Sequence, residues 1–94
     1  MSATIEVKKS AGGDPMTFAV AVREDESETR HDVTLSRAYL ARVAPGASAE
    51  QAIEAAFRFL LDREPKEAIL ARFDVSVISR YFPQFETRLP DYLR

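Results

Sequence analysis

The stretch that decides the fold is MTFAVAVREDESETRHDVTLS, residues 16–36, which reads as two strands and the turn between them. Large apolar side chains alternate with small or polar ones in its first part, at Met16, Phe18, Val20 and Val22. An acidic run at residues 24–28 interrupts the alternation, and Val33 and Leu35 resume it. Alternation with period two is typical of a half-buried strand, because successive side chains point to opposite faces. The stretch therefore predicts two antiparallel strands with one apolar face.

A third strand precedes this stretch. Residues 3–8 alternate in the same way, with Ile5 and Val7 on one face. Residues 10–15, SAGGDP, then carry the glycines and the proline of a turn. Three strands joined by short polar turns predict an antiparallel β-meander.

The chain after residue 36 reads as helical. The clearest helix is expected over residues 49–63, where Ser48 and Gln51 form a capping box and apolar residues recur every three or four positions. Shorter helices are expected over residues 37–44, 65–73 and 75–82, bounded by prolines. Helices must cover the apolar face of the sheet. We therefore predict an α+β fold: a three-stranded antiparallel β-meander followed by three to four short helices packed on one face.

Composition and charge narrow the class of protein. The 94 residues include 13 basic and 15 acidic side chains, with 46% hydrophobic residues. This fits one globular domain over residues 1–94, with residues 83–94 as a C-terminal extension. A general nucleic-acid binder needs a basic field, which a net charge of -2 does not supply, so nucleic acid is not the expected partner.

The absence of cysteine excludes disulfides, thiolate metal sites and cysteine nucleophiles, and it fits a reducing compartment. No stretch has the apolar length of a signal peptide or a membrane span. We expect a cytoplasmic protein without a membrane partner.

Catalytic and metal-binding patterns are sparse. His31 is the only histidine, and its strand phase places it with Val33 on the core face, away from Asp32. The acidic run at residues 24–28 lacks the ligand spacing and the glycine of a calcium loop. Gly12 and Gly13 precede a strand, whereas a phosphate-binding loop precedes a helix. We therefore expect no enzyme and no catalytic, cofactor or metal site.

Residues 31–64 resemble the ribbon-helix-helix family, because a short strand, a helix and a glycine-containing turn precede a longer serine-capped helix. In that family two strands pair across a dimer and present side chains to the major groove. The resemblance implies a DNA-binding dimer, a transcriptional regulator or antitoxin-like protein, that reads DNA with Arg30, Asp32 and Thr34. This is the alternative function that the sequence leaves open.

Two further resemblances concern the second half of the chain. Residues 68–85, AILARFDVSVISRYFPQF, are similar to a helix-turn-helix, with the turn at residues 74–76 and Ser79-Arg80-Tyr81 on the reading helix. Residues 59–86 also resemble a segment of small bacterial proteins of unknown function, a resemblance that implies no site residues.

The C-terminal PQFETRLPDYLR, residues 83–94, is too apolar for a solvated tail. Either it folds back over the domain or it docks on another protein. Tyr and Arg are enriched at interface hot spots. Under the docking hypothesis the partner-binding residues are Arg80, Tyr81, Phe85, Arg88 and Tyr92. The edge strands of the meander are a second surface for a protein partner or for self-association. The leading hypothesis is a small non-catalytic protein-interaction or accessory module.

Overall fold

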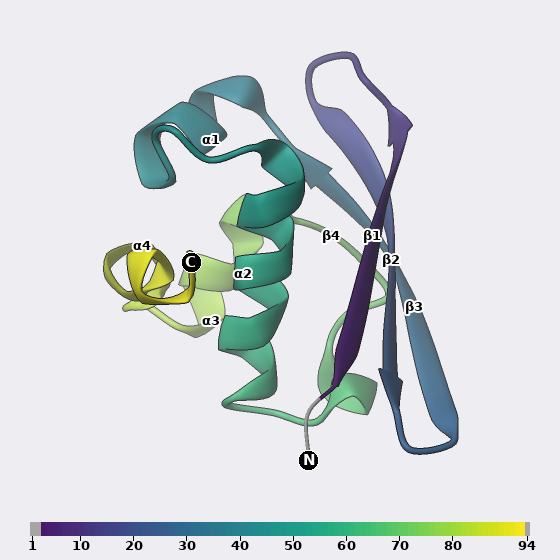
Figure 1. The fold of residues 1–94 in the computed structure, drawn as a ribbon. Coiled ribbons are helices and arrows are strands. Elements are labelled where there is room, and N and C mark those ends of the chain that lie inside the picture. The colour runs from purple at the N-terminus through teal and green to yellow at the C-terminus, as the bar shows by residue number, and fades with distance from the viewer. Residues whose placement is uncertain (1–2, 94) are drawn as a thin grey trace.

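The computed structural model describes residues 3–93 and shows a sheet with helices packed on one of its faces (Figure 1). The strands are β1 (Thr4–Ala11), β2 (Met16–Glu24), β3 (Ser27–Leu35) and β4 (Arg72–Asp74), and they lie side by side in this order. The helices follow the meander in the sequence and cover the face that carries its apolar residues. The predicted α+β fold is therefore confirmed.

The meander has the predicted antiparallel pairing. In β2 the central residue Val20 lies opposite Val7 of β1 on one side and opposite His31 of β3 on the other. The turn between β2 and β3 passes through Asp25, whose φ of 53° is in the left-handed region. Asp tolerates this conformation better than most residues, and two-residue hairpin turns require it.

The connection into β4 differs from the prediction. The helix expected over residues 65–73 is wrong, because only Lys66–Ala68 form a single 3-10 turn, η1. The chain then runs extended into β4, which pairs parallel to β3 with Phe73 opposite Val33. The backbone N–H of Asp32 donates to the carbonyl of Ala71 at 2.7 Å, so sheet bonds replace helical ones here. β4 is thus a fourth strand beside the predicted three.

The longer helices are α1 (Arg37–Val43) and α2 (Ala49–Leu61). α2 begins at the predicted capping box: Ser48 Oγ accepts from the Gln51 N–H at 3.0 Å, and Gln51 Oε1 accepts from the Ser48 N–H at 2.8 Å. Short turns follow β4, namely η2 (Val75–Val77), α3 (Ile78–Tyr81), α4 (Phe85–Arg88) and η3 (Leu89–Tyr92). Within residues 3–93, no helix has the length and apolar character needed to cross a bilayer.

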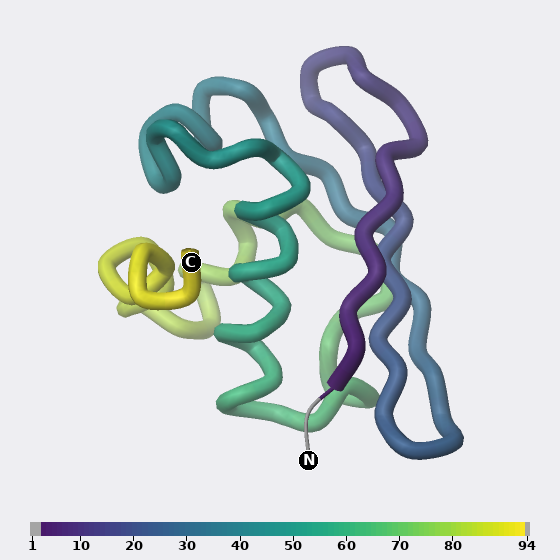
Figure 2. The backbone as a smooth tube through the Cα atoms, viewed as in Figure 1, coloured from purple at the N-terminus to yellow at the C-terminus, as the bar shows by residue number. Residues whose placement is uncertain are grey.

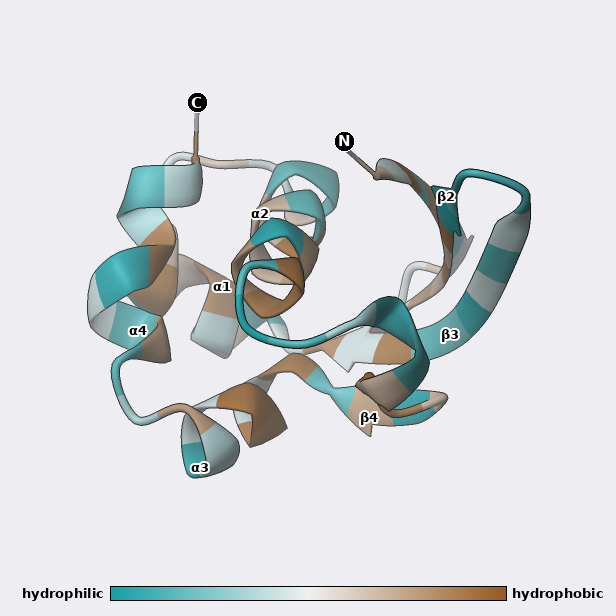
Figure 3. Cartoon of the chain, turned by 90° about the horizontal axis from the view of Figure 1, so that it is seen from below, coloured by the Kyte–Doolittle hydropathy of each residue, from teal (hydrophilic) through white to brown (hydrophobic). Residues whose placement is uncertain are grey.

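Helix α2 lies between the sheet and the C-terminal segment, which is yellow in Figure 2. Towards the sheet, Phe57 packs on His31 of β3, with ring centroids 5.4 Å apart. Towards the C-terminus, Phe59 packs edge-on against Phe85 of α4, with centroids 5.1 Å apart. α2 is therefore buried on two faces, and the C-terminal extension folds back to complete the core. Figure 3 shows α3 and β4 on the same side of α2, with hydrophobic residues between them.

Candidate functional site

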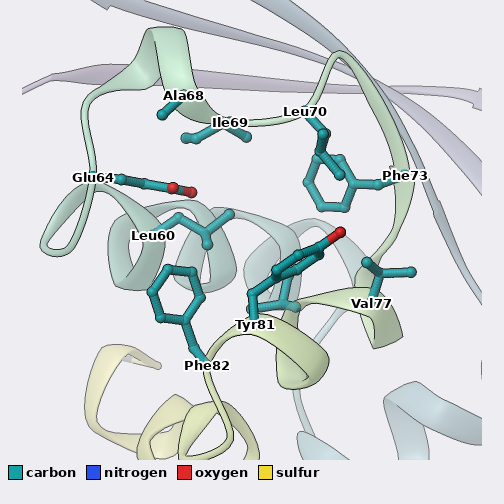
Figure 4. Close-up of a pocket in the computed structure, with 10 residues that line it drawn as sticks. Leu60, Glu64, Ala68, Ile69, Leu70, Phe73, Val77, Tyr81 and Phe82 are labelled. Carbon is teal, nitrogen blue, oxygen red and sulfur yellow. The ribbon is translucent and has the colours of Figure 1, made fainter.

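An apolar groove of about 420 Å³ opens between the end of α2, the connection into β4, and α3 (Figure 4). Its floor is formed by buried residues of all three segments, Leu60, Ile69 and Ile78. Phe73, Val77 and Phe82 line its sides. The groove is therefore an opening onto the hydrophobic core, and its shape depends on how the three segments are held together.

Two exposed side chains mark this groove. Within residues 3–93, Leu70 and Tyr81 are the large hydrophobic residues that remain exposed, at 49% and 67%. Both line the groove, Leu70 from the connection into β4 and Tyr81 from α3 (Figure 4). Single exposed apolar residues are common on protein surfaces, whereas a group beside a concave apolar surface is typical of a binding site.

His31 holds the backbone of Leu70 in place. The ring Nδ1 donates to the Leu70 carbonyl at 2.8 Å, and Nε2 lies 2.8 Å from Thr29 Oγ1. A carbonyl only accepts hydrogen bonds, so Nδ1 carries a proton, and in the neutral ring Nε2 accepts from the Thr29 hydroxyl. The histidine is buried, as its strand phase predicts. Both nitrogens are engaged, which gives His31 a positioning role beside the groove.

Lys66 fixes the other end of the same connection. Its side chain is almost fully buried, with 3% of the residue exposed. Nζ donates to Ser27 Oγ at 2.6 Å and to Glu67 Oε2 at 2.7 Å, and it lies 3.6 Å from Glu24 Oε1. The hydrogen bond to Glu67 and the nearby carboxylates raise the pKa of Lys66. One member of the acidic run thus serves as a partner for a buried lysine.

Asp74 orients the segment that leads to Tyr81. As predicted, it caps the following turn: its Oδ2 accepts from the N–H and the hydroxyl of Ser76, at 3.0 and 2.6 Å. Thr34 of β3 donates to its other oxygen. Burial acts to raise the pKa of Asp74, but these hydrogen bonds outweigh burial and lower it. The carboxylate therefore ties β3, β4 and η2 together.

Glu64 is the one charged residue that lines the groove. Its half-buried side chain extends into the space between Leu60 and Ala68 (Figure 4). Burial raises the pKa of its carboxyl group. Among the hydrogen bonds and ion pairs of residues 3–93, its backbone N–H is bonded to Leu60, but its carboxylate has no protein partner. The groove thus combines apolar walls with one unpaired acidic group.

The structure separates the predicted partner-binding residues. Tyr81 lies on the groove, and Arg80 is exposed next to it on α3. Phe85 is 0% exposed, because it fills the space beside Phe59, so its prediction as a docking residue is wrong. A side chain that is buried in its own core cannot also contact a partner.

The other two predicted residues lie away from the groove. Tyr92 is half-buried beside Phe59, and its hydroxyl donates to Asp62 at 2.6 Å, which fastens the C-terminal segment to the end of α2. Arg88 is exposed and lies 3.5 Å from Asp91. Tyr92 lines a separate depression with Leu93, so the predicted set does not form a single surface.

The residues predicted for DNA contact lie on β3. Arg30 and Asp32 are exposed, and Thr34 is half-buried and bonded to Asp74. β3 has β2 on one side and, over residues 32–34, β4 on the other. The ribbon arrangement needs this strand to pair with its own copy, and β4 occupies that edge.

The helix-turn-helix resemblance also meets a different geometry. Residues 75–77 form η2, and the helix that would read DNA, α3, spans only Ile78–Tyr81. A helix of one turn is too short to lie along a major groove.

Sequence reasoning missed the groove because its walls come from three separate segments, one of which was expected to be helical. The signal that was available is the apolar, proline-bounded stretch between residues 65 and 83. Over residues 3–93, no cluster of three or more His, Cys, Asp or Glu side chains has the geometry to hold a metal ion. No protein-family model, curated protein or solved structure shows a significant match to this chain.

Proposed function

We propose that this chain is a small, non-catalytic protein-interaction or accessory module, and that the groove beside Tyr81 receives an apolar segment of another protein. The observation that carries the proposal is the placement of Leu70 and Tyr81, the exposed large hydrophobic residues of the described chain, on one concave apolar surface. Exposed apolar surface is unfavourable in water, and a partner that covers it gains the corresponding free energy.

The size of the groove fits a short anchoring segment. Its volume of about 420 Å³ lies within the range of roughly 300–1,000 Å³ that is typical of ligand pockets. Burial of one large apolar side chain is worth about 1.5–3 kcal/mol. Two anchors therefore supply roughly 3–6 kcal/mol before the cost of association is subtracted. We expect weak and reversible binding of an isolated peptide.

The polar side chains that could support catalysis have structural partners. Both ring nitrogens of His31 are bonded, Lys66 is surrounded by oxygen atoms, and Asp74 caps a turn. These contacts favour a non-catalytic function. A cytoplasmic location is also part of the proposal, and it is supported by the absence of cysteine.

A displayed library of random twelve-residue peptides tests the proposal. Peptides selected on the wild-type protein should carry one or two large apolar residues. On titration they should shift the amide resonances of residues 60, 64, 68–70 and 77–82. Leu70→Ser and Tyr81→Ser should each weaken this binding at least tenfold while the circular dichroism spectrum stays unchanged.

Leu93→Ser is the matched control, because Leu93 lines the depression beside Tyr92 and not the groove. It should leave peptide binding unchanged. The proposal fails if no peptide binds better than its scrambled version, or if the two groove variants bind the selected peptides as well as the wild type does.

A further inference from the structure

Glu64 is the chemically distinctive group of the groove. Every other residue that lines it contributes an apolar surface or, in Tyr81, a phenol ring. The carboxylate reaches in from the chain just after α2, opposite Leu70 and Phe73 (Figure 4). An ionised carboxylate in such surroundings loses part of its hydration, and this cost grows when a ligand covers it.

The basic residues nearest to Glu64 in the sequence are engaged elsewhere. The guanidinium of Arg63 lies over the ring of Phe59, 3.7 Å from its centroid, and donates to the Phe59 carbonyl at 3.1 Å. The ammonium of Lys66 is bonded to Ser27 and Glu67. The groove therefore presents a carboxylate whose charge its own neighbours do not neutralise.

We propose that the segment received by the groove is a basic amphipathic one: it places a Lys or Arg side chain against Glu64 and an apolar side chain between Leu70 and Tyr81. This inference rests on the proposed function of the groove and specifies the chemistry of the protein partner. Glu64 selects the partner by its charge, and the apolar walls provide most of the contact area.

The selection works in two directions. A partner with a cationic group forms a charge-assisted hydrogen bond with Glu64, which is stronger than a neutral one. A purely apolar partner covers the carboxylate without replacing its lost water, so its binding is penalised. Glu64 thus acts for basic segments and against neutral ones, although both could fill the same apolar space.

A four-way comparison tests the inference with peptides selected from the library. Each peptide is made in two forms that differ only in Lys or Gln at the basic position, and each is titrated against wild type and Glu64→Gln. The Lys form should bind wild type about tenfold more tightly than the Gln form. Glu64→Gln should abolish this difference, and the Lys preference should weaken as salt is raised.

Glu50→Gln is the matched control. It removes the same charge from the exposed first turn of α2, about 20 Å from Glu64 along the helix axis. This variant should keep the Lys preference. A preference that depends on Glu50 as much as on Glu64 would mean that net charge alone is responsible, and it would overturn the inference.

The remaining outcomes separate the two proposals. Selected peptides that bind the groove without a basic residue, or whose binding ignores Glu64→Gln, overturn the inference and leave the proposed function standing. Failure of every peptide to bind the groove overturns both. A dimer of the free protein that Tyr81→Ser disperses would show that a second copy fills the groove, and it too would overturn the inference.

Discussion

At the residue scale, two aromatic side chains four positions apart in the sequence have opposite roles. Phe85 is fully enclosed, whereas Tyr81 is 67% exposed on the groove. Phe85→Ala should lower the free energy of unfolding by about 3–5 kcal/mol, because it leaves a cavity beside Phe59. Tyr81→Ala should change it by no more than about 0.5 kcal/mol. Urea denaturation of both variants checks this, and similar losses for the two would contradict the assignment.

Glu64 gives a pH-dependent prediction. Burial raises its pKa in the folded state, so folding favours the protonated form, and stability is lost as pH rises through the folded-state pKa. At pH 7, Glu64→Gln should therefore raise the free energy of unfolding slightly, by about 0.5 kcal/mol or less.

The advantage of Glu64→Gln should disappear below about pH 4, where the carboxyl group is protonated in both folded and unfolded states. Melting curves of wild type and variant across this range measure the difference. A variant that is less stable than wild type at neutral pH would show that the carboxylate has a stabilising partner after all.

At the element scale, the sequence was most informative where a single pattern governs a long segment. Alternation predicted the meander, and the Ser48–Gln51 capping box predicted the start of α2. Residues 65–73 were less predictable. Their apolar spacing suits a helix, but the sheet hydrogen bond from Asp32 and the bond from His31 hold them extended. Such long-range contacts override local propensity, and no pattern within the segment reports them.

The C-terminal segment gives a prediction at this scale. Residues 83–94 include Phe85 and Leu89, which are buried in the core. Loss of one such side chain costs about 2–5 kcal/mol, so loss of both approaches the roughly 5–15 kcal/mol that holds a typical domain together. A chain that ends at Phe82 should lose its cooperative thermal transition, as measured by circular dichroism.

Full-length Thr87→Ala is the control for this truncation, because Thr87 is exposed on α4 and its hydroxyl only bonds locally to the Gln84 carbonyl. It should melt as the wild type does. A truncated chain that still unfolds cooperatively would show that the segment is an accessory and not part of the core.

At the scale of the whole molecule, β1 is an edge of the sheet. Its polar face and its end carry charges, among them Lys8 and Lys9, and the pairing with β2 shifts register between Lys9 and Ala11. Charged residues and irregular register discourage pairing with another strand. The double variant Lys8→Val, Lys9→Val should therefore self-associate at concentrations where wild type does not, as sedimentation velocity can measure.

A double replacement of Lys8 and Lys9 by Glu is the control, because it changes the sign of the charge but keeps the edge polar. It should sediment as the wild type does. Equal self-association of both variants would show that the positive charges themselves, and not the polarity of the edge, keep the chains apart.

The groove was the least predictable part of the molecule. Tyr81 was singled out from the sequence as a contact residue, but Leu70 was assigned to a helix and Glu64 to a helix end. Only the path of the chain from α2 to α3 brings these three residues to one surface. A binding surface assembled from separate segments leaves no local pattern in a single sequence.

The floor of the groove has a practical consequence. Leu60, Ile69 and Ile78 face the binding space and belong to the core at once, so a bound molecule adds directly to the packing that holds the domain folded. A compound at one hundred times its dissociation constant stabilises the folded state by about 2.7 kcal/mol. Melting temperature is thus a built-in reporter of occupancy. A thermal-shift screen can recognise the ligand of this protein before anyone knows what to look for.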